Sequence, residues 1–407
     1  MMIADLMIDR RGLLRLELPN GEQKMADKLQ KTKGGSYTYE KLPPKLRARK
    51  RQACSEPVRP VRLTAKTSVA DLVEAMSGMS IQARNIGLCA EVLKGIYTDR
   101  KRPTVFLGLA GPLVAAGLRG VIRDLIAAGG VDVVVSTGAI LYQDIYQARG
   151  FQHFKGSAQA DDAELRDLHL DRIYDTYVDE DHFWETDAWV GRQADALPPG
   201  NYSSRQFMNH LADQLEDEDS IVVTCRRRGV PMIVPAINDS SIGIGITEHR
   251  LRCLREDRPG VAIDSIQDNH ELTQIVVHSP MTAAVYVAGG VPKNYINDSV
   301  VMSYLYGLER GHDYAMQVTT AVTADGGLSS STLSEARSWG KIKKAARFAM
   351  AWVEPSVSLP LLVGYVLGRK LTSQRKPLAL EWDGYYLRSL RAAAPAPRRR
   401  SGRKSTT

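Results

Sequence analysis

The chain has 407 residues, 43% of them hydrophobic, and a formal net charge of +8 at pH 7. This length suits one large α/β domain or two modest ones. Apolar runs stay well below the ~18 residues of a membrane span, and the start lacks the basic-then-apolar layout of a secretory signal, so we expect a cytoplasmic protein with no membrane partner. The four cysteines form no C-x-x-C pair, so we expect neither a bound metal nor a disulfide framework.

The first segment in chain order is a polar, basic arm, residues 1–56, which we predict to be flexible. Five basic residues lie between Lys45 and Arg51, and five more lie between Arg398 and Lys404 in a Pro/Ala-rich C-terminal tail, 371–407. Removing these ten charges from +8 leaves −2 for the rest of the chain. The basicity therefore belongs to two extensions with a disordered composition. RNA binding through them is a hypothesis that their deletion would test, but we do not expect nucleic acid to be a main partner.

Helix and strand patterns alternate between residues 57 and 370. Ser68 and Asp71 mark the start of a helix over 68–76. A buried strand over 104–110, a helix over 111–130 and a strand over 131–139 form the repeating unit of a parallel sheet. Further strands are predicted at 230–237, 260–264, 282–290, 314–322 and 347–354, and helices at 203–215, 265–279, 294–308 and 356–370. The acidic stretch 151–200 is predicted to form loops or short helices. The pattern predicts one α/β domain, a doubly wound, mostly parallel Rossmann-like sheet with helices on both faces.

Small residues gather where the predicted strands end, at 108–112, 136–139, 238–243, 288–294 and 323–327. In open parallel sheets, ligands bind beyond the carboxyl ends of the strands, and the following helix N-termini favour phosphate. A dinucleotide fits this description, although no G-x-G-x-x-G follows the first strand. Asp239 and Asp325 stand where ribose hydroxyls would be bound, and both are equally typical of turns and helix caps.

Lys341, in the segment Ser334–Lys344 (SEARSWGKIKK), is the strongest candidate nucleophile. A free lysine is almost entirely protonated at pH 7. Its amine becomes nucleophilic when it is desolvated or placed near other cations. Trp339 offers an apolar wall, so spacing alone leaves open a Schiff-base lysine or an ordinary surface cation. No HExxH, Gly-x-Ser-x-Gly or P-loop motif competes with this reading.

Several motifs together resemble the deoxyhypusine synthase family, over roughly residues 60–370. EARSWGKI resembles the segment whose lysine carries a covalent imine, and VDVVVSTGA, VPAINDSSIG, AGGVPKN and SLPLLV occur in the family's order. The resemblance implies that NAD oxidises a polyamine such as spermidine, that the lysine captures the aminobutyl imine, and that an acceptor amine takes it over before the stored hydride is returned. The same fold serves homospermidine synthases. The family forms homotetramers with sites at subunit contacts, and we expect the same here.

The resemblance assigns roles to individual positions. Lys341 is the catalytic residue. Trp339, Glu335, Asn294 and Asp144 fall on substrate-binding positions. The positions that resemble the NAD site are Ser136, Thr137, Gly138, Asp239, Gly289, Gly290, Thr320, Ala321, Asp325 and Glu354.

The chain also departs from the family pattern. Asn294 replaces a histidine, Gln143 a glutamate, Ile244 and Leu328 each an aspartate, and Glu354 an aspartate. Because each buried ammonium needs a partner, a tricationic polyamine is a poor fit. The sequence therefore predicts an NAD-dependent aminoalkyl transferase acting on a diamine or a guanidino-amine such as agmatine, rather than on spermidine plus a protein lysine. The alternative is a catalytically weakened sensor or scaffold that binds NAD or polyamine.

Overall fold

The computed structural model describes residues 5–8, 14–17 and 42–392, and the chain divides into two compact units, Met1–Pro57 and Val58–Thr407. In the first unit, β1 (Asp5–Ile8) and β2 (Leu14–Glu17) pair antiparallel, and α2 (Pro44–Ala53) has no buried residue. The remainder of the arm for which flexibility is predicted lies outside the described residues. Among the described residues, no helix has the length and apolar content needed to cross a membrane.

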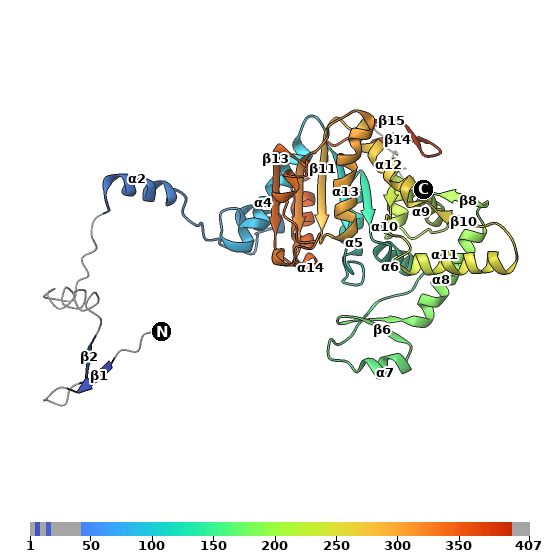
Figure 1. Ribbon diagram of the computed structural model, residues 1–407, viewed down its shortest axis with the longest axis horizontal. Coiled ribbons are helices and arrows are strands. Elements are labelled where there is room, and N and C mark those ends of the chain that lie inside the picture. The colour runs from blue at the N-terminus through green and yellow to red at the C-terminus, as the bar shows by residue number, and fades with distance from the viewer. Residues whose placement is uncertain (1–4, 9–13, 18–41, 393–407) are drawn as a thin grey trace, which may run out of the picture. The chain divides into compact units, whose positions relative to one another are not determined.

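A six-stranded, all-parallel sheet forms the centre of the second unit (Figure 1). Its order is β13-β12-β11-β3-β4-β9. Counted along the chain this is 3-2-1-4-5-6, the doubly wound order, with the reversal between β3 and β11. The predicted fold class is thus confirmed. The strands are β3 (Thr104–Leu109), β4 (Val133–Ser136), β9 (Met232–Ile233), β11 (Thr282–Val287), β12 (His312–Val318) and β13 (Ile342–Ala351).

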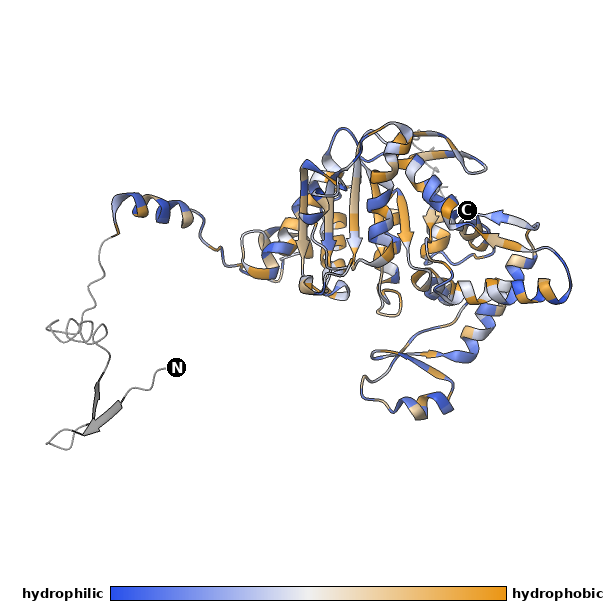
Figure 2. Ribbon diagram, in the orientation of Figure 1, coloured by the Kyte–Doolittle hydropathy of each residue, from blue (hydrophilic) through white to orange (hydrophobic). Residues whose placement is uncertain are grey.

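Both faces of this sheet are covered by helices, which is why β3 and β11 are buried along their whole length. Side chains alternate between two cores: Val105 and Leu107 face one core, and Phe106 faces the other. The first core includes α4 (Ile81–Thr98), α5 (Arg119–Ala127) and α14 (Pro355–Gly368), and the second includes α12 (Ser265–His278) and α13 (Gly290–Val301). Figure 2 shows hydrophobic residues concentrated in these central elements. The other helices of the body include α3 (Val69–Met76), α6 (Gly138–Ala148), α9 (Ser204–Ala212), α10 (Ile221–Arg228) and α11 (Ser241–Arg255).

Several predicted elements differ in the structure. The strand predicted at 230–237 is only the two-residue β9. The helix predicted over 111–130 begins only at Arg119, because Gly117 has φ +84, which no α-helix residue adopts. The strand predicted at 260–264 is β10 (Val261–Ile263), but it pairs with β8 (Gly200–Tyr202) in a separate two-stranded sheet. β13 begins at Ile342, five residues earlier than predicted.

The prediction of loops or short helices over 151–200 holds for one six-residue helix but misses the rest of the regular structure. This stretch contains a three-stranded sheet of β5 (Phe154–Lys155), β7 (Thr176–Asp179) and β6 (Leu170–Ile173), together with α7 (Asp162–Asp167). It also contains the 16-residue helix α8 (Glu180–Asp195). Asp179 caps α8, and Glu180 and Asp181 lie in its first turn, where negative charge is stabilising. The acidic run is therefore a helix start.

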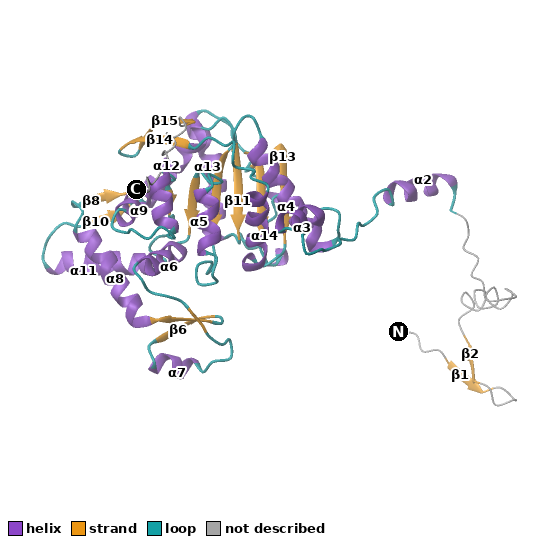
Figure 3. Ribbon diagram, turned by 180° about the vertical axis from the view of Figure 1, so that it is seen from behind, coloured by secondary structure: helices purple, strands orange, loops and turns teal. Residues whose placement is uncertain are grey.

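The folded body continues past residue 370, where composition indicates a disordered tail. β14 (Leu378–Asp383) and β15 (Tyr386–Ala392) form a hairpin that packs beside α12 (Figure 3). The buried Gln274 side chain donates to Tyr385 O at 2.8 Å and accepts from Leu387 N at 3.0 Å. These contacts attach the hairpin to residues more than a hundred positions away in sequence, which composition does not reveal. Residues 393–407 lie outside the described residues.

We expect Gln274→Ala to destabilise the body by about 1–3 kcal/mol, because it leaves the buried Leu387 N–H without an acceptor. Arg388→Ala is the matched control: it removes an exposed ion pair to Asp383 inside the same hairpin, worth about 0–1 kcal/mol. Urea unfolding measures both, and amide exchange of 378–392 should accelerate only in Gln274→Ala. Equal effects of the two substitutions would contradict this account.

Candidate active site

The connection from β12 to β13, residues 319–341, contains no α-helix, only the 3₁₀ turns η2 (Thr323–Asp325) and η3 (Glu335–Arg337). It starts at the carboxyl end of β12 and returns to the amino end of β13. Lys341 is its last residue, and its carbonyl accepts from His312 N at 3.0 Å. The backbone of Lys341 therefore lies at the amino edge of the sheet, beside His312, the first residue of β12.

The Lys341 ammonium group is held by α13. Its Nζ donates to Asn294 Oδ1 at 2.9 Å and lies 3.2 Å from Asp298 Oδ1. Asn294 Nδ2 in turn donates to Asp298 Oδ2 at 2.9 Å, as residues four apart on one helix face can. The Trp339 ring centroid lies 5.4 Å from Nζ. With 15% of its side chain exposed, Lys341 is not an ordinary surface cation.

Lys293, the neighbour of Asn294, is a buried cation with 1% exposure. Its Nζ donates to Ser331 O at 2.6 Å and Leu328 O at 3.1 Å, both in the 319–341 connection. Burial lowers the pKa of Lys293 to about 8; the attraction of Glu335 opposes this shift, and the charge of Lys341 adds to it. Lys293 therefore fastens the segment that carries Glu335, Trp339 and Lys341 onto α13.

The glycine turn that starts α13 lies at the carboxyl edge of the sheet, beside the point where strand order reverses. Gly290 has φ +58, and its N–H donates to Ser329 Oγ at 2.9 Å. A Cβ at Gly289 would approach Ser329 Cα to 2.6 Å, and one at Gly290 would lie 3.7 Å from Ala110 Cβ. Asn294 follows Gly290 by one helical turn, about 6 Å along the axis. The turn and the Lys341 amine are therefore neighbours.

The other predicted cofactor residues also follow strands at this carboxyl edge. A Cβ at Gly138, which follows Ser136 and Thr137, would meet Ser240 Oγ at 2.2 Å, so the β4 and β9 loops touch next to Asp239. Thr320, Ala321 and Asp325 follow β12, and Glu354 follows β13. The Glu354 carboxylate caps α14, accepting from Ser356 N at 2.7 Å. The residues therefore form groups spread along the edge, not one cluster.

This edge suits a dinucleotide. α6, α11 and α13 all begin without a side-chain hydrogen bond to their first turn, unlike α14. Such N-termini leave backbone N–H groups for phosphate oxygens. Asp239, after β9, and Asp325, after β12, are exposed carboxylates on either side of the reversal of strand order. A carboxylate is the group that binds ribose hydroxyls in doubly wound folds.

Asp144 does not join the Lys341 cluster. It is completely buried, and its carboxylate accepts from Arg119 Nε at 2.7 Å, Ser220 Oγ at 2.6 Å, Ile221 N at 3.0 Å and Val222 N at 2.8 Å. These bonds anchor the start of α10. The geometry within one chain gives Asp144 a structural task.

Sequence reasoning missed two residues of the site, Lys293 and Asp298. Asp298 had a readable signal, because it stands four positions after Asn294 and so shares its helix face. Lys293 had none, since a lysine within a loop-to-helix sequence is ordinarily solvated.

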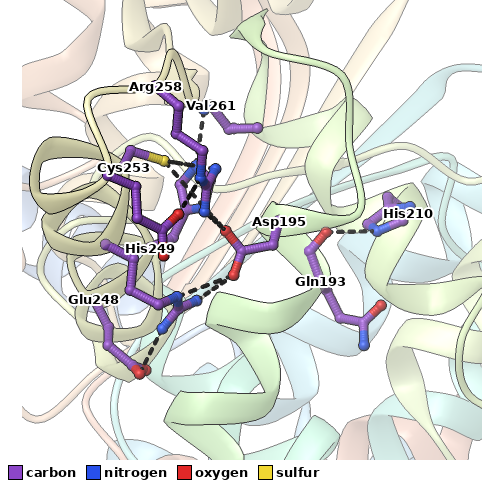
Figure 4. A network of polar contacts seen from close by, with 10 residues as sticks. Gln193, Asp195, His210, Glu248, His249, Cys253, Arg258 and Val261 are labelled. Atoms are coloured by element: carbon purple, nitrogen blue, oxygen red, sulfur yellow. Dashed lines mark hydrogen bonds and ion pairs between the residues drawn. The ribbon is translucent and has the colours of Figure 1, made fainter.

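A separate cluster of Asp195, His249 and Cys253 has the residue types of a metal site (Figure 4). His249 Nε2 accepts from Val261 N at 2.9 Å, so its Nδ1 carries the proton that Asp195 Oδ1 receives at 2.7 Å. Arg258 Nη1 donates to Cys253 Sγ at 3.0 Å. The His249 Nε2 and Cys253 Sγ atoms that could bind a cation are thus already occupied by the Val261 N–H and the Arg258 guanidinium group.

The same cluster is an ion-pair network that joins α8 to α11. Burial opposes ionisation of Asp195, but hydrogen bonds from Arg258, Arg252 and His249 lower its pKa to about 2. The carboxylate is saturated by these donors. The geometry favours a structural network over a metal site.

Comparison with known proteins assigns the family. The deoxyhypusine synthase family model matches residues 71–366. The chain is 40% identical over 348 residues to the "Deoxyhypusine synthase-like protein" of Chlorobaculum tepidum, covering 84% of this chain and 95% of that protein. It is 40% identical to "Probable deoxyhypusine synthase 2" of Methanosarcina acetivorans, covering 78% of this chain and 92% of that one. The crystal structure of a candidate deoxyhypusine synthase from Entamoeba histolytica shares the fold, with a TM-score of 0.55, 18% identity, and coverage of 76% of this chain and 97% of that chain.

The buried Lys293 ammonium predicts a pH-dependent stability. Its pKa is about 8 in the folded chain against 10.5 as the ordinary value, so between these pH values the unfolded chain binds a proton that the folded chain has released. The free energy of unfolding should therefore rise with pH across this window, by up to ~3 kcal/mol from this group.

Lys293→Met should lose that rise while keeping the side-chain volume. Lys66→Met, at an exposed lysine, is the control that should keep it. Denaturant unfolding at pH 7.5 to 10.5 gives the comparison. Parallel curves for wild type and Lys293→Met would refute the assignment.

Proposed function

The chain belongs to the deoxyhypusine synthase family, and from its site geometry we propose that it moves an aminoalkyl group between amines through an imine on Lys341, with NAD as hydride carrier. One observation carries the proposal. The partly buried Lys341 amine is bonded to Asn294, one helical turn from the Gly289–Gly290 turn. A reactive amine and a dinucleotide-type loop are thereby joined by a single rigid helix.

Asp298 is the group that prepares the lysine. An amine attacks carbon only after it loses its proton, and the Asp298 carboxylate lies 3.2 Å from Lys341 Nζ, within reach for proton transfer. Asn294 Oδ1 accepts a hydrogen bond from another N–H of Lys341 Nζ. This bond fixes the orientation of the amine, and so the direction of its lone pair, once the proton has left. Asn294 itself cannot take the proton, so this role falls to Asp298.

NAD held by the Gly289–Gly290 turn and the helix N-termini of this edge would supply a hydride acceptor for the donor carbon that carries the amine, and the same hydride would be returned at the end. Lys341 attacks the oxidised carbon, so a bond forms from Nζ to carbon while the bond to the leaving amine breaks. The leaving amine departs with the proton that Asp298 held. An acceptor amine then attacks the same carbon, Lys341 is released, and the returned hydride leaves no net oxidation.

The charges around Lys341 favour a small substrate. Asp298 lies 3.2 Å from Lys341 Nζ, the Trp339 ring lies 5.4 Å from the same atom, and the exposed Glu335 precedes Trp339 by four residues. These groups suffice for one remote ammonium or guanidinium group and the methylenes between. Ile244 and Leu328 stand where the family places aspartates, and they are 56% and 36% exposed. A diamine or a guanidino-amine such as agmatine is therefore the proposed donor, in preference to a tricationic polyamine with a protein lysine as acceptor.

A homotetramer with its sites at subunit contacts belongs to the same proposal. It is supported by the exposure of the Trp339 side chain, 67%, which leaves one wall of the site uncovered in a single chain. The alternative is a sensor or scaffold that binds NAD or polyamine without turnover. It is favoured by the loss of a histidine at Asn294, a glutamate at Gln143 and the two aspartates at Ile244 and Leu328.

Borohydride trapping decides between the two. The full chain is incubated with NAD and, separately, putrescine, agmatine or spermidine, then reduced and examined by intact mass and peptide mapping. We expect an NAD-dependent adduct on Lys341 whose mass names the transferred group, and its loss in Lys341→Ala.

Lys343→Ala is the matched control, since Lys343 lies two residues away and pairs with Asp313 at 2.7 Å. It should trap like wild type. Confirmed NAD binding without an adduct from any of the amines would reject the transferase and favour the sensor.

A further inference from the structure

A pocket lies at the amino edge of the sheet, where β3 begins. Its volume is about 610 Å³, within the range of small-molecule sites. It lies between the end of α4, the end of α14 and the segment 369–376, which follows the family-matched residues 71–366. The helices α4 and α14, at whose ends it lies, cover one face of the sheet, whereas the Lys341 amine is held by Asn294 and Asp298 of α13 on the other face. The pocket is therefore separate from the site around Lys341.

Positive charge dominates its lining. Six cationic side chains face one carboxylate, Asp99, which already accepts from Tyr314 OH at 2.9 Å. The six cations are Arg100, Arg102, Arg369, Lys370, Arg375 and Lys376.

Half of these cations have acidic partners. Arg102 and Arg375 share the single buried carboxylate of Asp132, so that trio keeps one net positive charge. Arg369 pairs with Asp71 and Glu74. Within residues 42–392, the exposed Arg100, Lys370 and Lys376 pair with no carboxylate.

Arg375 is the most buried cation of the pocket. Only 2% of its side chain is exposed, and its Nη atoms donate to Asp132, to Gly129 O and to Pro103 O. Its Nε is buried and has no hydrogen-bond partner among the described residues. A buried donor left without an acceptor is destabilising, and a ligand oxygen would supply the acceptor.

Cations near helix C-termini offset the helix dipole, and this accounts for Arg369 and Lys370 at the end of α14. It does not account for Lys376 or for the unpartnered Nε of Arg375, which lie beyond that helix. The neutral polar side chains Ser373 and Gln374 add groups that can donate hydrogen bonds. The Thr98 hydroxyl also lines the pocket, but it donates to Lys94 O at 2.7 Å.

We propose that this pocket binds a phosphate-bearing small anion of nucleotide size. Guanidinium groups match phosphate oxygens in planar, two-point hydrogen bonds, and lysines add point charge. The ligand completes the bonding of Arg375 and neutralises Arg100, Lys370 and Lys376. The inference does not depend on the chemistry proposed for Lys341.

The test is calorimetric titration of the full chain with tripolyphosphate at constant ionic strength, with ATP and AMP in parallel arms. The pocket variant is Arg100→Gln/Lys370→Gln/Lys376→Gln. The control variant, Lys66→Gln/Arg250→Gln/Arg255→Gln, removes the same charge from exposed residues that do not line the pocket. We expect saturable 1:1 binding that weakens about tenfold or more in the pocket variant and less than about twofold in the control.

Tighter binding of ATP than of tripolyphosphate would identify a nucleotide as the ligand, and equal binding would identify the phosphate chain alone; both support the site. Equal weakening in the two variants would reduce the effect to general electrostatic attraction and overturn the proposal. Absence of saturable binding to every probe would overturn it as well. Circular dichroism of both variants shows that a loss of binding is not a loss of fold.

Discussion

The contact between the Lys341 ammonium and the Asn294–Asp298 face of α13 is the interaction on which the site depends. α13 starts at the glycine turn beside the reversal of strand order and runs back along the sheet. Its first turn therefore lies at the carboxyl edge proposed for the dinucleotide, and its second turn carries Asn294, which binds Lys341. A rigid helix fixes the separation of the two to about one turn, which a pair of loops would not do.

Burying Lys293 is the structural requirement for that arrangement. A buried ammonium is costly unless it is hydrogen-bonded, and here Ser331 O and Leu328 O accept its protons. These hydrogen bonds explain how the 319–341 connection, which contains no α-helix, holds a fixed position along α13. Lys341 reaches Asn294 and Asp298 because the connection is fastened ten residues earlier.

Much of the fold could be predicted, because the β3 and β4 runs are continuously apolar, as strands buried on both faces must be. The resemblance of its Trp-Gly-Lys segment singles out Lys341, and the structure places its amine against Asn294 and Asp298. Lys293 and the hairpin over 378–392 could not be predicted, because their partners come from distant parts of the chain. The acidic start of α8 was misread since negative charge suits both a solvated loop and a helix N-terminus. Tertiary contacts, not local pattern, decide such cases.

The central claim is that hydride storage and the lysine-bound imine belong to one centre. Its most direct test follows deuterium from a donor amine labelled on the carbons bonded to nitrogen, with NAD present below the enzyme concentration. The account predicts that the product keeps the full deuterium content at the carbon joined to the acceptor nitrogen. Loss of that deuterium, together with its appearance in released NADH, would contradict the account.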